Sequence, residues 1–304
     1  MQDEFVIRPL ETHDDYYQAE GVQRVAWGMS DDSAMVPLHL LITVEHNGGL
    51  VLGAFAPDGS MVGFLFGFMG RTEGERAALM GTPYYHCSHM MGVRPEFQGR
   101  SVGYRLKCAQ RDFVLKQGLR LAVWTYDPLM SLNAWLNVGR LGVTCRHYIV
   151  DLYGEIREEL NTGLPTDRFE VEWWLTSDRV ATYLDPTSPR HYPTPVEWRM
   201  SGAEMVSQTA IWRDELRAPT GWRRVHSDEI MVEIPADFQA IRRADMACAL
   251  EWRLFTREIF QWAFAEGYVV GWFAREQTTE GRRSYYVLSR NMDIAALAGG
   301  PHAG

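Results

Sequence analysis

The sequence is poor in cysteine and has no paired cysteine motif. Its 304 residues include four cysteines, at positions 87, 108, 145 and 248, and none of them forms a CxxC pair. This absence argues against the usual zinc-binding and thioredoxin-like classes. We therefore expect free thiols in a reducing compartment and no bound metal.

Long apolar runs and a signal-like start are also missing. The apolar stretch 62–69 is far shorter than the roughly 20 residues that span a bilayer. The opening Met-Gln-Asp-Glu-Phe has neither the basic start nor the apolar run of a secretory signal. We expect a cytoplasmic protein without a membrane partner.

Positive charge is in deficit. The chain has 30 Lys and Arg against 39 Asp and Glu, and a net charge of −9. Binding to nucleic acid depends on clustered cations that release counterions from phosphates, so nucleic acid is not expected as a partner. One local basic group stands out and suits a small polyanion: Arg94, Arg100, Arg105, Lys107 and Arg111.

Hydrophobic residues make up 46% of the chain, enough for a substantial core, and their periodicity predicts alternating strands and helices. We expect an α/β (α+β) protein with a mixed, mostly antiparallel sheet flanked by helices. The predicted strands are 5–10, 50–56, 61–69, 84–93, 121–126, 143–153, 168–175, 230–234, 268–274 and 284–288; the predicted helices begin near 12, 101, 130 and 245.

Composition also suggests a division of the chain. Four prolines fall between 186 and 195, which is typical of a linker or an extended crossing segment. We predict a main domain over 1–175, a linker over 176–229, a smaller C-terminal α+β module over 230–290 and a disordered tail over 291–304. The tryptophan-rich helix of the C-terminal module needs an apolar partner, and we therefore also predict a homodimer formed through this module.

The segment after the predicted strand 84–93 has the features of an anion site. Pro95 ends the strand, and Gly99 and Gly103 allow close approach of the backbone before an amphipathic helix begins. The first N–H groups of a helix bind anions, and pyrophosphate suits such a turn. The patterns GxGxxG and GxxxxGK[ST] are absent here, which argues against nicotinamide and nucleoside triphosphate binding.

These residues resemble the acyl-CoA signature of the GNAT acyltransferase superfamily, which runs Val-x-Pro, a short gap, then Gln/Arg-x-x-Gly-x-Gly/Ala before an apolar helix. Val93, Pro95, Gln98, Gly103 and Leu106 match it. Ser101 stands in place of the first glycine of the turn. A GNAT-type fold and acetyl-CoA or another acyl-CoA as co-substrate are what this resemblance implies.

Nearly the whole chain, to about Arg290, also resembles a bacterial group of predicted GNAT acyltransferases. Members are often encoded near N-acylamino acid racemases, which implies acylated amino acids as a substrate class. The segments that carry this resemblance are 88–99 (SHMMGVRPEFQG), 124–142, 147–155, 164–175 and 232–241.

The resemblance implies roles for single residues. Asn133 on the following helix would lie beside the cofactor, and Val138 stands where most relatives have a tyrosine near the thiolate leaving group. The residues implied for pantetheine are Met91, Gly92 and Val93, and those implied for pyrophosphate are Gln98, Gly99, Arg100, Ser101, Val102 and Gly103.

Acyl transfer to an amine needs a base for the ammonium and an acid for the departing thiolate. Strand alternation puts His89 on the same face as Met91, and imidazole suits the base; a structural histidine is the alternative. Tyr148, or else Tyr126, is the candidate acid because a phenol rests protonated. Either tyrosine can instead be a packing residue with a bonded hydroxyl.

Two further residues are candidates for substrate binding. Asp127 follows a strand and can attract a cationic amine, although Asp-Pro is also a common start of a turn. Arg168 can recognise a substrate carboxylate or pair with its neighbour Asp167. The sequence leaves both alternatives open.

The sequence thus predicts an N-acyltransferase that moves an acetyl or succinyl group from acyl-CoA directly to the primary amine of a small metabolite, with amino acids as one class. A covalent route through Cys87 or Cys145 lacks a flanking base. The alternative, motivated by Val138 and Ser101, is a CoA-binding regulatory or assembly module that has lost catalysis.

Overall fold

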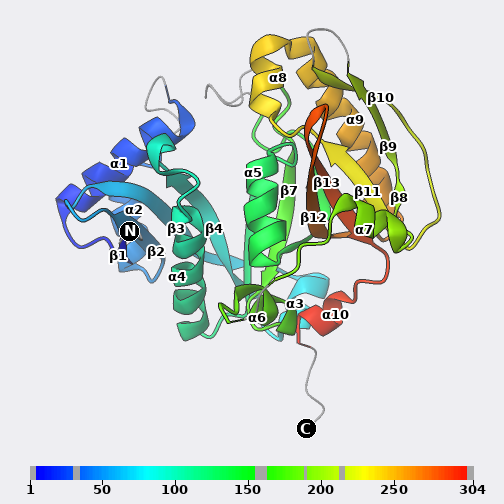
Figure 1. The fold of residues 1–304 in the computed structure, drawn as a ribbon. Coiled ribbons are helices and arrows are strands. Elements are labelled where there is room, and N and C mark those ends of the chain that lie inside the picture. Colours follow the sequence, from blue (N-terminus) through cyan, green and yellow to red (C-terminus); the bar gives the residue numbers. More distant parts are fainter. Residues whose placement is uncertain (1–4, 30–34, 155–162, 188–189, 212–215, 300–304) are drawn as a thin grey trace. The chain divides into compact units, whose positions relative to one another are not determined.

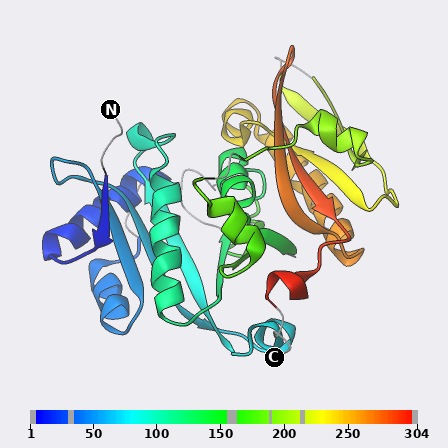
Figure 2. The same ribbon diagram turned by 60° about the horizontal axis from the view of Figure 1, so that its bottom comes forward.

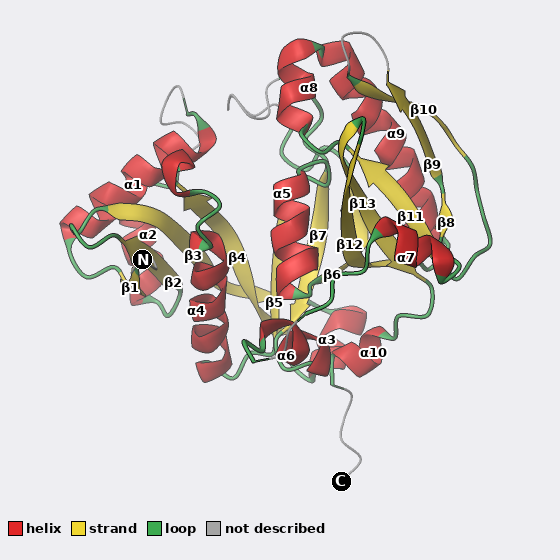
Figure 3. Ribbon diagram, in the orientation of Figure 1, coloured by secondary structure: helices red, strands yellow, loops and turns green. Residues whose placement is uncertain are grey.

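The computed structural model describes residues 5–29, 35–154, 163–187, 190–211 and 216–299. The described residues form two compact units, 5–124 and 125–299. Figure 1 colours the chain along the sequence, and Figure 3 distinguishes its helices from its strands.

The first unit holds strands that pair in the order β1-β2-β3-β4-β5. Neighbours are antiparallel except β4 and β5, which are parallel. Its elements are β1 (Val6–Pro9), α1 (His13–Trp27), α2 (Leu38–His46), β2 (Leu50–Phe55), β3 (Met61–Arg71), α3 (Gly74–Met80), β4 (Tyr84–Val93), the 3₁₀ turn Pro95–Phe97, α4 (Val102–Lys116) and β5 (Leu121–Tyr126), whose last two residues belong to the second unit.

Helices cover both faces of this first sheet (Figures 1 and 2). On one face, α1 and α2 bury Val22 and Leu41 against Phe64 and Phe66 of β3. On the other, α4 buries Leu106 against Leu65 and other side chains of β2 and β3. Burial of both faces explains why β2 and β3 read as nearly continuous apolar runs.

The second unit pairs its strands in the order β7-β6-β12-β13-β11-β8, with only β11 and β8 parallel, and carries a separate antiparallel pair, β9 and β10. Its elements are α5 (Ser131–Ala134), the π-helix Trp135–Leu141, β6 (Thr144–Ile149), β7 (Arg168–Trp174), α6 (Asp178–Leu184), α7 (Pro195–Met200), β8 (Glu204–Met205), β9 (Ser207–Ile211), β10 (Arg217–Trp222), β11 (Glu229–Ile234), α8 (Phe238–Ala244), α9 (Met246–Ala265), β12 (Val269–Thr278), β13 (Gly281–Ser289) and α10 (Ile294–Leu297).

An aromatic cluster forms the centre of the second unit. The ring of Phe169 on β7 has its centroid 4.7 Å from that of Phe260 on α9 and 5.3 Å from that of Tyr286 on β13. Edge-to-face contacts of this kind stabilise a core beyond the area they bury. Helix α9 begins where predicted, because the Asp245 side chain accepts the N–H of Cys248 as an N-cap.

The predicted mixed, mostly antiparallel sheet flanked by helices is confirmed in both units. Strands β4 and β5 have the predicted bounds. The sequence did not predict α3, α7 or α8, which are only six or seven residues long and therefore show little periodicity.

Two segments predicted to lack regular structure contain helices or strands. The predicted linker 176–229 contains helices α6 and α7 and strands β8, β9 and β10, because Pro186 stands in a turn, Pro195 begins α7 and Pro219 lies within β10 rather than in one extended stretch. The predicted disordered tail 291–304 includes α10, with Ile294 and Ala298 buried, while 300–304 lie outside the described residues.

The chain passes from the first compact unit to the second between Trp124 and Thr125 rather than near 175. The physical reason is that the predicted C-terminal module is not separate: β12 pairs with β6 through Val270 and Cys145, so strands from both sides of position 175 share one sheet. An isolated module would leave an unpaired strand edge. The functional division of the chain and the homodimer remain predictions.

Candidate functional site

The predicted phosphate turn joins β4 to α4 within the first unit. Two of its residues adopt left-handed backbone conformations, Gly99 with φ 79° and Ser101 with φ 62°. Space within 4 Å of where a Gly99 Cβ would be is empty of protein atoms. Ser101 therefore takes the conformation that glycine would adopt at low cost, and it does so although it carries a Cβ.

Helix α4 starts directly after this turn with no side chain capping its N-terminus. The first N–H groups of a helix point away from its body and lie at the positive end of the helix dipole, and in α4 this end begins at Val102 and Gly103. Gln98 and Arg100 are exposed beside them, and Gln98 also donates to the Val93 carbonyl at 3.5 Å. The arrangement can bind an anion.

A β-bulge interrupts β4 at His89. Phe66 of β3 is opposite Met90 and Gly67 is opposite Ser88, so His89 has no partner in the ladder. A bulge inserts one residue and shifts the alternation of side chains beyond it.

The prediction that the side chains of His89 and Met91 lie on the same face of β4 is therefore wrong. His89 lies against Phe66 and Phe68, with ring centroids 5.6 and 6.0 Å away, and Phe66 belongs to the core under α1 and α2. Met91 packs instead into the core under α4. The sequence shows no glycine or proline at this point that would have revealed the bulge.

The two histidines of β4 have different environments. Burial of part of the His89 ring lowers its pKa, while the side chain still reaches solvent. His86 is buried on the α4 side, where its Nε2 accepts from the Gln110 amide at 2.9 Å. Burial, followed by the charge of Lys107, lowers the pKa of His86 to about 3, so this imidazole is neutral at pH 7.

Tyr148 is bonded to a buried carboxylate in the second unit. Its hydroxyl donates to Asp167 Oδ2 at 2.6 Å, and Arg257 on α9 donates to both oxygens of the same carboxylate at 2.8 Å. Burial, and then the charge of Asp167, raises the pKa of Tyr148 well above its ordinary value. The phenol thus rests protonated, with its proton directed at Asp167.

Tyr126 is buried in the same unit. Its hydroxyl lies 3.0 Å from that of Tyr286, which donates to the Pro128 carbonyl at 2.9 Å. Burial raises the pKa of Tyr126 well above its ordinary value. In the described residues both candidate phenols have internal partners, which is the packing alternative that the sequence left open.

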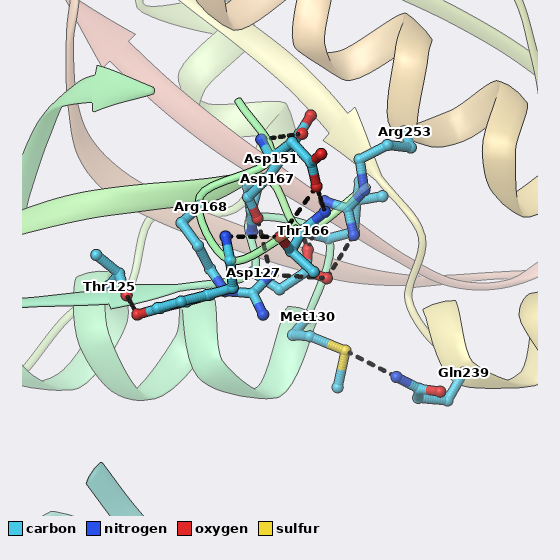
Figure 4. A network of polar contacts seen from close by, with 12 residues as sticks. Thr125, Asp127, Met130, Asp151, Thr166, Asp167, Arg168, Gln239 and Arg253 are labelled. Carbon is cyan, nitrogen blue, oxygen red and sulfur yellow. Dashed lines mark hydrogen bonds and ion pairs between the residues drawn. The ribbon is translucent and has the colours of Figure 1, made fainter. Parts of the chain in front are cut away.

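Asp127 lies in a network of polar contacts on the second unit (Figure 4). Arg253 of α9 donates to its two oxygens at 2.8 and 2.5 Å, and the Leu129 N–H donates at 2.9 Å. Burial alone would raise the pKa of Asp127, but the charges and hydrogen bonds of Arg253 outweigh it and the pKa is lowered.

Arg168 belongs to the same network. It is buried, donates to the Asp167 carbonyl at 2.9 Å and has its Nη1 4.0 Å from Asp127 Oδ2. The structure thus brings Asp127, Arg168 and Tyr148 into one connected set of contacts with Asp167 and Arg253. Sequence reasoning missed Arg253 and Arg257, whose helical spacing reads as an ordinary charged face.

Asn133 lies on α5 and Val138 on the π-helix that continues it, both in the second unit. Asn133 of α5 is exposed, whereas Val138 in the π-helix is fully buried. A π-helix is uncommon and often marks a functional site. The role of Asn133 beside a cofactor remains a prediction.

The predicted basic group is less open than its sequence suggests. Arg94 Nε donates to the Met61 carbonyl and Arg105 to the Phe5 carbonyl, so both guanidinium groups fix the chain within the first unit. Lys107, another member of this group, is 2% exposed. Arg100 is the exposed member at the turn itself.

Within the described residues, no group of three or more His, Cys, Asp or Glu side chains has the arrangement of a metal site. Among the same residues, no helix is both long enough and apolar enough to cross a bilayer.

No protein-family model matches the chain, and no curated protein sequence matches it either. Solved structures are similar to it at low sequence identity. A GNAT-family acetyltransferase from Streptococcus pneumoniae is 14% identical, over 56% of this chain and 98% of the other, with a TM-score of 0.41.

An N-acetyltransferase from Staphylococcus aureus is 14% identical, over 57% of this chain and 99% of the other, with a TM-score of 0.43. A GNAT-family acetyltransferase from Brucella melitensis, in complex with acetyl-CoA, is 19% identical, over 41% of this chain and 77% of the other, with a TM-score of 0.32. All three TM-scores lie below 0.5. The function of this chain is therefore inferred from its own residues.

Replacing Asp127 by Asn should destabilise the protein by about 3–5 kcal/mol, because the Arg253 charge would stay buried without its counter-ion. Since the pKa of Asp127 is lowered in the folded state, its stabilising effect is fully present above the unfolded value of about 4 and is lost progressively as pH falls from there through the lower folded value. Denaturant unfolding at pH 7 and pH 3 measures both effects. Asp228→Asn, at an exposed site, is the control; equal stability of the two variants would contradict the pairing.

Proposed function

We propose that this protein is an acyl-CoA-dependent N-acyltransferase that moves an acetyl or succinyl group to the primary amine of a small metabolite in the cytoplasm. The transfer is direct, from a complex that holds both substrates, and it uses no metal. Amino acids are the proposed class of acceptor, which rests on the sequence resemblance alone.

One observation carries the proposal: the left-handed Gly99 and Ser101 lead into a helix that no side chain caps. A sequence that merely connected a strand to a helix would more commonly place Ser, Thr, Asp or Asn as an N-cap with a bonded side chain. Here the serine at the cap position makes no such bond. The positive end of the α4 dipole therefore suits an anion such as the pyrophosphate of CoA.

The acyl-CoA would be held by the first unit. Residues 98–103 would bind the pyrophosphate, and the backbone of Met91, Gly92 and Val93 would pair with the pantetheine arm. A Cβ at Gly92 would meet the Trp27 ring at 2.7 Å, so the glycine allows β4 to pack closely against α1. Asn133 is proposed as a further cofactor contact.

His89 is the proposed base. Its lowered pKa keeps the imidazole neutral at pH 7 and able to take a proton from the acceptor ammonium. Its place on the bulge also supports this role, since bulges redirect side chains beside active sites.

Tyr148 is the proposed acid and Tyr126 the second candidate. The hydroxyl of Tyr148 is already donated to Asp167, so acid catalysis would require this hydrogen bond to open. Arg168 is proposed to bind a substrate carboxylate and Asp127 the substrate amine, although Arg253 already engages both oxygens of Asp127.

The decisive experiment incubates the purified protein with acetyl-CoA or succinyl-CoA and a panel of amines, and measures release of free thiol. Turnover with at least one pair of donor and acceptor is the expected result. The alternative function is a CoA-binding regulatory or assembly module, which the internally bonded phenols and the buried Val138 favour. Tight CoA binding without turnover would establish the alternative.

Replacing Gly103 by Val should weaken CoA binding more than about tenfold, because a branched side chain in the first turn of α4 would obstruct the approach of the phosphates to the amides. Calorimetry measures the dissociation constant. Asp112→Val, at an exposed site of the same helix, controls for the lower helix propensity of valine. An unchanged constant in folded Gly103→Val would remove the assigned turn.

Replacing Tyr148 by Phe should lower kcat by roughly 10²–10⁴ with little change in CoA affinity, if this phenol protonates the thiolate. Tyr285→Phe is the matched control, because Tyr285 also donates to a carboxylate, at 2.7 Å to Glu276. Equal rates for the two variants would assign Tyr148 a structural role, and a loss confined to Tyr126→Phe would transfer the role to that residue.

A further inference from the structure

A lysine is buried in the first unit among groups that only accept or share hydrogen bonds. Lys107 Nζ lies 2.8 Å from Ser88 Oγ, 3.1 Å from Gln110 Oε1 and 3.5 Å from the centroid of the Trp124 ring. An ammonium has three hydrogens, and a hydroxyl oxygen, an amide oxygen and an aromatic face are three acceptors. The geometry suits the charged form.

The counter-charge is missing from the described part of this environment. No carboxylate of a described residue forms an ion pair with Lys107, and a buried ammonium without one is costly. Burial lowers the pKa of Lys107 well below its ordinary value, against a smaller opposite effect of Cys87. Three acceptors favour the ammonium and burial opposes it, so an anion arriving nearby would shift Lys107 towards the charged form.

The buried histidine beside Lys107 cannot supply that anion. His86 is neutral at pH 7, and its Nε2 accepts from the Gln110 NH₂ group. This hydrogen bond fixes the Gln110 amide with its oxygen towards Lys107. Hydrogen bonds thus connect His86, Gln110, Lys107 and Ser88 in series. The Ser88 hydroxyl ends this series, and its hydrogen can still be donated to another group.

Ser88 lies on β4 where the proposed co-substrate would run. The paired residues of β4 and β5 are His86 with Ala122 and Cys87 with Val123, and Ser88 and Trp124 come directly after them. The phosphate turn follows the C-terminal end of β4, so a pantetheine arm paired with residues 91–93 continues along the strand towards Ser88. Three residues of extended chain separate Ser88 from Met91, roughly 10 Å.

We propose that Lys107 is a positioning residue for acyl transfer, acting through Ser88 on the sulfur of the leaving group; this rests on the proposed function. Lys107 donates to Ser88 Oγ, which leaves the hydroxyl hydrogen free to bond to sulfur. When the amine attacks, a C–N bond forms and the C–S bond breaks, with its electron pair staying on sulfur. The Ser88 hydroxyl and the Lys107 charge stabilise this thiolate. The base takes the proton of the acceptor ammonium before attack, and the nitrogen loses a second proton to solvent as the amide forms.

The test measures the pKa of the thiol of bound CoA from thiolate absorbance as a function of pH, together with kcat and KM. In wild type, bound CoA should ionise at a pH about one unit below free CoA. Lys107→Met and Ser88→Ala should each return this value to that of free CoA. Both variants should lose about 10²-fold in kcat with KM changed less than about threefold.

The double variant should lose no more than either single variant, because the two side chains act as one unit. Lys116→Met, at an exposed site of the same helix, is the control that should behave as wild type. If Lys107→Met does not fold, Ser88→Ala carries the same test. An unchanged thiol pKa in folded variants, or losses that add, would overturn the proposal.

Failure of the proposed function looks different. A wild-type protein that binds CoA but turns over no amine would contradict the enzyme, while the absorbance measurement would still show whether Lys107 acts on the sulfur. A bound thiol that ionises at the same pH as free CoA in the wild type would contradict the role of Lys107 even in an active enzyme.

Discussion

Two carboxylates fasten the longest helix of the second unit to the rest of that unit. Arg253 and Arg257, four residues apart on α9, each donate to both oxygens of one carboxylate, Asp127 and Asp167 respectively. Paired hydrogen bonds of this kind fix orientation as well as distance. The loop that starts α5 and the turn after β6 thus take their positions from α9, since Asp127 also binds the Leu129 N–H and Asp167 the Asp151 N–H.

This constraint explains why residues that the sequence suggested for substrate binding and catalysis have structural partners in the fold. A carboxylate whose oxygens are occupied by a buried guanidinium is a poor amine receptor, because the incoming ammonium must displace a partner that has nowhere else to go. The same holds for the phenol of Tyr148, whose proton is already donated to Asp167. Breaking such contacts costs energy that substrate binding would have to supply.

Sequence reasoning succeeded where the signal is local. The bounds of β4 and β5, the Asp245 cap of α9 and the strand-turn-helix order around Gly99 follow from propensity, capping and turn chemistry within a few residues. The bulge at His89 could not be predicted, because it depends on the register between β3 and β4. The burial of Lys107 could not either, since its acceptors Ser88 and Trp124 come from two strands far from it in the sequence.

The valine at position 138 is then compatible with catalysis. A leaving thiolate can be stabilised by a proton or by a nearby positive charge, and the second route needs no phenol. Val138 and the bonded hydroxyls of Tyr126 and Tyr148 make the first route costly in the second unit. Lys107 offers the second route from the first unit, beneath the strand proposed to bind the thioester, and its low exposure strengthens the effect because charges interact more strongly where water is excluded. The valine at position 138 and the burial of a lysine without a carboxylate partner among the described residues are thereby connected by one electrostatic requirement, the stabilisation of the leaving thiolate.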